Sequence, residues 1–152
     1  MRKWLIRNLV QALLALIAFF ARRPALTPFT TLLTRALAAF TVQARGIGRA
    51  DSVAELGPLW QRAFPSPRQV PLTGGDARTV FAEIRTPCPL RGSGDVHACH
   101  RMMEFDREVL RRAGGQFVVL ESQARPGRTH CRVAMRLRGE SLQDLRPAHA
   151  PR

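Results

Sequence analysis

FVVLESQARPGRTHCRVAMRLR, residues 117–138, is the stretch that decides the fold. Residues 117–123 are rich in strand-forming side chains, and residues 130–138 alternate between apolar and basic side chains, as a half-buried strand does. Between them, residues 125–128 (RPGR) carry the proline and glycine typical of a turn. The stretch therefore predicts two antiparallel strands joined as a hairpin.

The second of these strands has one apolar face and one basic face. The apolar face carries Cys131, Val133, Met135 and Leu137, and the other face, apart from Ala134, carries His130, Arg132, Arg136 and Arg138. Because side chains alternate across a strand, Cys131 is expected to point into the core. The first strand has apolar residues on both faces, which would suit a homodimer contact or another docking surface.

Residues 95–112 predict one main helix before the hairpin, with Asp95 as N-cap and Gly114 placed to end it. At about 100° per residue, the apolar side chains, Cys99 among them, form one broad arc. The opposite, polar arc holds His97, His100, Arg101, Glu104, Arg107, Glu108, Arg111 and Arg112. Asp106 lies near the centre of the apolar arc, about 20° from Cys99, so we expect this carboxylate to face the core.

The remaining segments complete an α+β organisation. Residues 79–86 (TVFAEIRT) alternate as a further strand, and Cys88 follows in a loop between two prolines. We therefore predict, over residues 76–138, a small antiparallel sheet packed on one main helix. Residues 43–75 are expected to be a polar linker with one short helical patch and a turn at its Gly-Gly-Asp end, and residues 139–152 a flexible tail.

The N-terminal segment, residues 1–42, is expected to be helical and apolar. Its two apolar runs are short for a bilayer span, which needs about 20 residues. A signal peptide, a spanning anchor, an interfacial helix or short helical hairpin, and core helices of a soluble protein are the alternatives. We favour membrane association without a full span. We place it on the cytoplasmic face, because three cysteines without a C-x-x-C pair are expected to be reduced.

The charge restricts the partners. A net charge of +13, from 23 arginines and one lysine against 11 acidic residues, suits anionic partners. The arginines are spread along the chain, and there is no tyrosine and only two tryptophans to stack on bases. We therefore expect residues 1–42 to meet a membrane surface or anionic lipid, and we do not expect a nucleic-acid partner.

Four side chains are the candidate site. If the helix packs on the apolar face of the hairpin, Cys99, Asp106 and Cys131 converge on one pocket with Cys88 at its rim. A core-facing carboxylate must be hydrogen-bonded, paired or held neutral, and such groups serve in acid and base catalysis. The alternatives are a structurally satisfied Asp106 with inert thiols, and a zinc site on the three cysteines. We expect no cofactor.

The order of these residues resembles a known family. Cys88-Pro89, then Cys99 and Asp106 on a helix, and finally a turn with Gly127 before Cys131 are similar to the L-2-amino-thiazoline-4-carboxylic acid hydrolase family over residues 79–138. The resemblance implies opening of a cyclic thiazoline at its C=N carbon to give a carbamoyl-cysteine. It implies catalysis by Cys88, Cys99, Asp106 and Cys131, with a thiolate attacking and the carboxylate moving a proton.

Three functions follow as hypotheses. The first is a membrane-associated hydrolase of a small cyclic sulfur and nitrogen compound. The second is a non-catalytic module that binds a small molecule or a metal, because a similar pattern occurs in vinyl-reductase-type small-molecule-binding domains. The third is an accessory protein that docks on a membrane complex through its apolar N-terminus.

Overall fold

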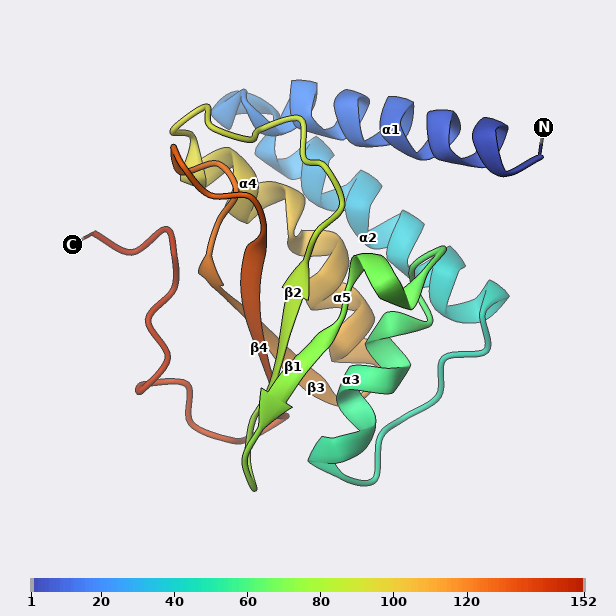
Figure 1. The fold of residues 1–152 in the computed structure, drawn as a ribbon, viewed down its shortest axis with the longest axis vertical. Helices are drawn as coiled ribbons and strands as arrows, with labels where there is room; N and C mark the ends of the chain where they lie inside the picture. Colours follow the sequence, from blue (N-terminus) through green and yellow to red (C-terminus); the bar gives the residue numbers. More distant parts are fainter. Residues whose placement is uncertain (1, 152) are drawn as a thin grey trace.

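The chain forms helices around one antiparallel sheet, as a computed structural model describes it for residues 2–151, without the side chains of residues 2, 3, 6 and 7. Figure 1 shows the arrangement of these elements. In chain order they are α1 (Arg2–Ala21), η1 (Pro24–Leu26), α2 (Thr27–Ala44), α3 (Val53–Gln61), η2 (Pro67–Gln69), β1 (Leu72–Gly75), β2 (Val80–Ile84), α4 (Val96–Met102), α5 (Glu104–Arg112), β3 (Gly115–Glu121) and β4 (Cys131–Leu137). The predicted α+β class with an apolar helical N-terminus is confirmed.

The sheet has four strands in the order β1-β2-β4-β3, all antiparallel. The hairpin expected at residues 117–138 is β3 and β4, in a register that pairs Val119 with Val133. On the other side of β4, Cys131 pairs with Ile84 at the end of β2. β1 was not predicted, since its two glycines indicated a turn; backbone pairing with β2 makes them an edge strand instead.

The predicted helix 95–112 is two helices. α4 and α5 meet at Met103, where the backbone turns, although the Asp95 side chain caps α4 through the amide of Ala98 as expected. The apolar arc still faces the core, because Cys99, Val109 and Leu110 are all buried. The break leaves the alignment of Cys99 and Asp106 toward the sheet intact.

Residues 43–75, which were expected to be a linker, contribute side chains to the core. α3 packs against β2, β4 and α5, and its Leu56 and Trp60 are fully buried. Val70, just before β1, is fully buried as well. Leu56 and Trp60 enter the core because the short amphipathic helix α3 covers sheet surface that α4 and α5 leave open.

The C-terminal residues are held against the sheet rather than free. The amide of Ala148 donates to the carbonyl of Val119 at 2.8 Å, and Arg136 makes two hydrogen bonds to the Asp144 carboxylate at 2.6 and 2.7 Å. Arg136 was expected to face solvent, but this segment covers it and it is 2% exposed. The expected flexible tail is therefore held by an ion pair between the buried Arg136 and the exposed Asp144, which local sequence patterns do not reveal.

α1 and α2 form an outer layer on α4 and α5. α1 crosses one end of the molecule and α2 runs beside α5 (Figure 1). α2 buries Thr30, Thr34 and Ala38 against the core, and Arg35 pairs with Glu104 of α5 at 2.7 Å. Pro24–Ala44 is long and apolar enough to span a membrane by length and composition. In this structure α2 packs on α4 and α5, and 17% of its apolar window is buried.

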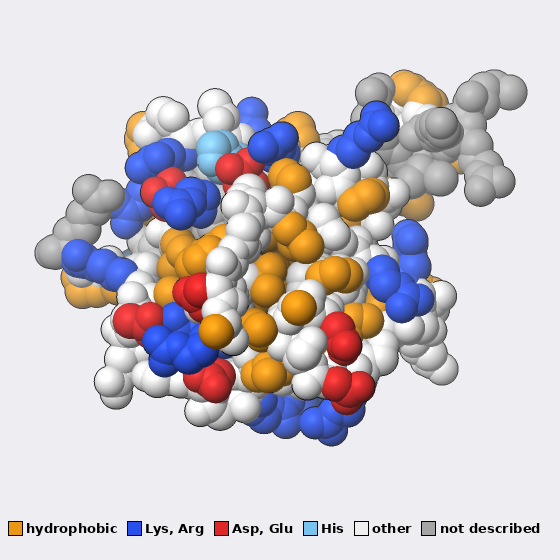
Figure 2. Space-filling model, turned by 60° about the horizontal axis from the view of Figure 1, so that its bottom comes forward, with side chains coloured by type: hydrophobic (Ala, Val, Ile, Leu, Met, Phe, Trp, Pro, Cys, Tyr) orange, Lys and Arg blue, Asp and Glu red, His pale blue; other side chains and the backbone are white. Residues whose placement is uncertain are grey.

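The charged side chains are dispersed. Seen from below the view of Figure 1, basic and acidic side chains lie beside one another in several places toward the edge, and hydrophobic side chains gather toward the middle (Figure 2). Basic and acidic groups are paired in several places, for example Arg132 and Arg128 with Glu121. This face does not present a continuous basic track of the kind that follows a nucleic-acid backbone.

Candidate functional site

Three of the four predicted site residues line one cavity. Cys88 from the loop after β2, Asp106 from α5 and Cys131 from the start of β4 face a cavity of about 350 Å³. The sheet brings Cys131 beside the Cys88 loop because β4 pairs with β2, and α5 packs across the same sheet face. Cys88, Asp106 and Cys131 therefore converge on one cavity, as the strand alternation and the helical period predicted for Cys131 and Asp106.

Cys99 lies behind the cavity rather than in its lining. Its thiol is hydrogen-bonded to the thiol of Cys131 and also to the hydroxyl of Ser122. The hydrogen bond from Cys131 favours negative charge on Cys99, and the proton stays on Cys131, whose pKa is raised by this bond and by burial. The thiol best placed to ionise is therefore not the one that a ligand in the cavity would meet.

Cys88 is half-buried at the rim of the cavity. Its Sγ accepts a hydrogen bond from the amide of Leu90 at 3.4 Å, but burial has the larger effect and raises the pKa of the thiol. Both thiols in the lining, Cys88 and Cys131, are thus expected to be protonated at neutral pH. They offer weak hydrogen-bond donors and soft apolar surface.

Asp106 is the strongest chemical feature of the site. It is 6% exposed, and the indole Nε1 of Trp60 donates to its Oδ1 at 2.9 Å. Burial raises the pKa of Asp106 to about 6, and the Trp60 hydrogen bond opposes that rise only in part. A carboxyl group near this value changes its protonation close to neutral pH, which suits ligand recognition or proton transfer.

Trp60 and Gln123 were not predicted as part of the site. Gln123 holds the Cys88 loop: its Oε1 accepts from Arg91 at 2.9 and 2.8 Å, and its Nε2 donates to the carbonyls of Ile84 and Thr86, both at 3.0 Å. Trp60 lies within a segment expected to be a linker. The only sequence signal was a large aromatic side chain in a short helical patch, and it does not indicate a carboxylate partner.

The opposite wall of the cavity is apolar and comes from α1 and α2. Its main contributors are Val10, Leu13, Leu14, Ile17, Leu37 and Phe40. The cavity therefore has a polar end at Asp106 and a long apolar side. This arrangement suits a molecule that is mostly hydrocarbon and has one hydrogen-bonding group.

The structure gives no support to the alternative zinc site. Within residues 2–151, apart from the undescribed side chains near the N-terminus, no group of three or more His, Cys, Asp or Glu side chains is placed to hold a metal ion. His97 and His100 lie away from Cys99, as the helical wheel indicated. His100 instead stacks at 3.8 Å on His149, and burial lowers its pKa to about 4.

The chain was also compared with known proteins. Neither a protein-family model, nor a curated protein, nor a solved structure matches it.

Proposed function

We propose that this protein binds a small, largely apolar molecule in the cavity beside Asp106 while α1 and α2 hold it at a membrane surface. One observation carries the proposal. A single cavity of about 350 Å³ has an apolar wall from α1 and α2 and a polar end at Asp106. Small-molecule sites have this composition, with a few polar groups that fix the orientation of the ligand.

The state of Asp106 supports a binding role. None of the ion pairs among the described residues includes this buried carboxylate. A carboxylate that ionises without a cation destabilises the folded protein, so its presence at a cavity is a candidate sign of function. A ligand that donates a hydrogen bond to Asp106 would relieve this penalty.

The thiols favour binding over nucleophilic catalysis. A cysteine nucleophile acts as the thiolate, and catalytic cysteines have lowered pKa values in electropositive, partly exposed places. The pKa of Cys88 is raised by burial, and that of Cys131 by its bond to Cys99 and by burial. We therefore assign the two thiols to the shape and polarity of the cavity.

Hydrolysis of a cyclic amidine of the aminothiazoline type is the second candidate, and the pKa of about 6 at Asp106 favours it. In this route Asp106 takes a proton from water as the water oxygen bonds to the C=N carbon, and passes it to the ring nitrogen. The second water proton follows as the ring C–N bond breaks and the carbonyl forms. No thiolate is needed.

A fluorescence titration tests the binding function. N-phenyl-1-naphthylamine is apolar, has one N–H donor and emits strongly only in apolar surroundings. The double variant Leu37→Phe with Ala44→Phe fills the cavity lining, and Leu33→Phe with Ala36→Phe is the matched control, since it changes α2 outside the lining. We expect saturable binding by the wild type and the control and at least a tenfold loss in the filled variant; equal binding by all three would refute the site.

A separate assay tests hydrolysis. The full chain is incubated with L-2-amino-thiazoline-4-carboxylate, and carbamoyl-cysteine is measured by mass spectrometry. Turnover that is lost in Asp106→Asn would support the second candidate. Absence of product with wild-type protein that binds the naphthylamine probe would leave binding as the function and reject hydrolysis of this substrate.

A further inference from the structure

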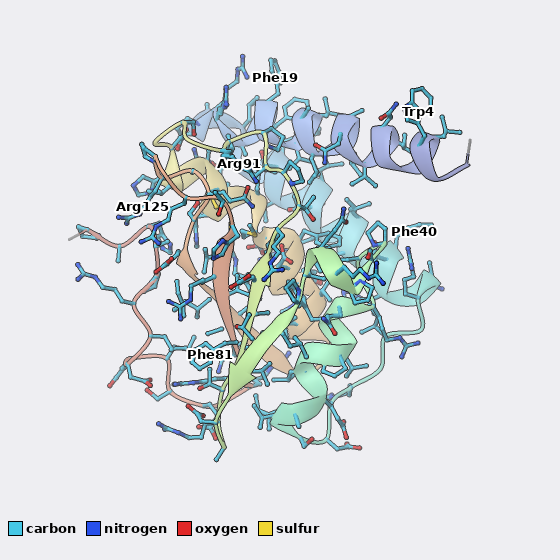
Figure 3. The ribbon with its side chains drawn as sticks, in the orientation of Figure 1. Trp4, Phe19, Phe40, Phe81, Arg91 and Arg125 are labelled. Atoms are coloured by element: carbon cyan, nitrogen blue, oxygen red, sulfur yellow. The ribbon has the colours of Figure 1, made fainter. Side chains whose placement is uncertain are left out.

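α1 and α2 each present apolar side chains in two directions. One set lines the cavity, and another set points away from the protein. Among the described residues, every exposed large hydrophobic side chain except Leu72 belongs to these two helices, each being 48% to 69% exposed. They are Trp4, Leu5, Leu9, Leu16, Phe19, Phe29, Leu32 and Phe40. Figure 3 shows Trp4 and Phe19 pointing away from the body of the molecule.

The formal charge carried by the segment that forms this surface is of one sign. The first 50 residues of the sequence contain eight basic residues and no acidic residue. Arg22 and Arg23 are exposed at the end of α1, and the Arg23 guanidinium lies 3.7 Å from the centre of the Phe19 ring. Apolar and aromatic side chains bordered by arginines are the composition of helices that lie in the headgroup region of anionic bilayers.

Phe40 connects this outer surface with the cavity. It lines the cavity and is also 69% exposed, so the cavity mouth borders the outward apolar surface of α2. In Figure 3 its side chain lies beside α2, clear of the sheet. A molecule that leaves a bilayer beneath these helices could enter without crossing water.

We propose that the cavity takes a lipid-soluble amphiphile with a hydrogen-bond-donating head directly from an anionic bilayer, through the mouth at Phe40. The proposal rests on the binding function above and names the class of ligand and its source. The head would meet Asp106, and the hydrocarbon would lie between α1 and α2. A volume of about 350 Å³ is at the lower end of small-molecule sites and suits one single-chain or ring-bearing molecule.

The first measurement is binding of the full chain to vesicles. Vesicles of phosphatidylglycerol with phosphatidylcholine are compared with phosphatidylcholine alone by flotation. The variant Leu9→Gln with Leu32→Gln removes two exposed apolar side chains outside the cavity lining, and Ala54→Gln with Ala77→Gln is the control on exposed positions elsewhere. We expect binding to anionic vesicles, weakened by salt, and a loss of about tenfold or more in the leucine variant only.

The second measurement is transfer of N-phenyl-1-naphthylamine from vesicles to the protein. A Trp4→Phe background leaves Trp60, beside Asp106, as the only tryptophan, and its quenching reports arrival of the probe. Transfer by contact gives a rate that rises with vesicle concentration, whereas transfer through water gives a rate that does not. We expect a transfer rate that rises with vesicle concentration. The variant Leu37→Phe with Ala44→Phe, whose cavity is filled, gives the background quenching of Trp60.

The outcomes separate the two proposals. If the leucine variant binds the probe in solution like the wild type but takes it from vesicles at least tenfold more slowly, bilayer entry is supported. If its transfer rate is unchanged or independent of vesicle concentration, bilayer entry is refuted while the binding site stands. A chain that ignores vesicles and forms a dimer, which Leu9→Gln with Leu32→Gln dissociates, would assign the outward surface to self-association and also overturn the inference.

Discussion

The two sides of α5 carry carboxylates in opposite situations. Asp106 faces the cavity, is 6% exposed and has the Trp60 indole as its side-chain partner. Glu108, on the other side, is 3% exposed and accepts hydrogen bonds from Arg111 at 2.6 and 2.7 Å and from Arg112 at 2.8 Å. Burial raises the pKa of Asp106 to about 6, whereas the Arg111 hydrogen bond lowers the pKa of Glu108.

The comparison teaches that burial alone does not set the charge of a side chain. Glu108 is covered by the arginines that neutralise it, so it is satisfied within its own helix. Asp106 has no such cation and lies where an added molecule could reach it. A buried carboxylate left without a cation next to a cavity is the better candidate for function.

The largest effect is expected from removing the partner of Asp106. Trp60→Ala deletes a fully buried side chain that also packs on Phe64 and Phe117, so we expect a loss of about 3–5 kcal/mol in the free energy of unfolding. Urea unfolding measures it. Trp60→Phe should lose less but should raise the pKa of Asp106 further, because the indole hydrogen bond is gone. A loss below about 1 kcal/mol for Trp60→Ala would show that α3 packs only loosely on α5.

Asp106→Asn should stabilise the protein at neutral pH. The pKa of Asp106 is higher in the folded chain, at about 6, than the ordinary value of 3.8, so the folded state binds more protons between these values and stability falls as pH rises through them. The variant should remove this fall and gain on the order of 2 kcal/mol above pH 6. Identical stability curves for both proteins from pH 4 to 8 would contradict the unpaired state of Asp106.

Glu108→Gln should lower the free energy of unfolding, and by less than Asp106→Asn raises it. Its arginine partners are about half exposed, and solvent screens such pairs, so we expect a loss of about 1 kcal/mol at pH 7. Because the pKa of Glu108 is lowered in the folded chain, this contribution is present above its ordinary pKa and disappears as pH falls through the lowered value. Thermal unfolding at pH 7 and pH 3 checks both points, and a stabilising substitution would count against the arginine pairing.

The smallest effects concern the thiols. Cys88 is half-buried and the other two cysteines are buried, so alkylation of the native protein should label Cys88 first. Its raised pKa should make labelling at pH 7 slower than for a free cysteine and faster as pH rises. Saturating N-phenyl-1-naphthylamine should slow it further. Mass spectrometry locates the label; rapid labelling of Cys131 in native protein would overturn the protonated state assigned to it.

Part of the fold was predictable because it depends on local periodicity. The alternation over residues 130–138 placed Cys131, Val133 and Met135 in the core, and the helical period placed Cys99 and Asp106 there, even though Met103 breaks the helix in two. A short break changes the direction of a helix but leaves each half its own apolar face. The sequence alone therefore predicted that Asp106 is buried and that it lies near Cys131 and Cys88.

The partners of those residues were not predictable in the same way. Nothing in the segment around Trp60 indicates that its indole meets Asp106, and Glu108 was placed on the solvent side because only its helix was considered. The covering of Arg136 by Asp144 and the joining of α1 and α2 to the cavity are contacts of the same kind. Each depends on where distant segments pack.

The sequence by itself determined the α+β class, the strands of the central hairpin and the inward faces of its helix, because periods of 2 and about 3.6 residues act within a few neighbouring residues. Only the tertiary structure decided which carboxylate has a cation, which thiols line the cavity, and that the apolar N-terminal helices form one wall of the candidate site. Those features are set by contacts between residues far apart in the chain, and the free energy of such contacts depends on the whole packed arrangement.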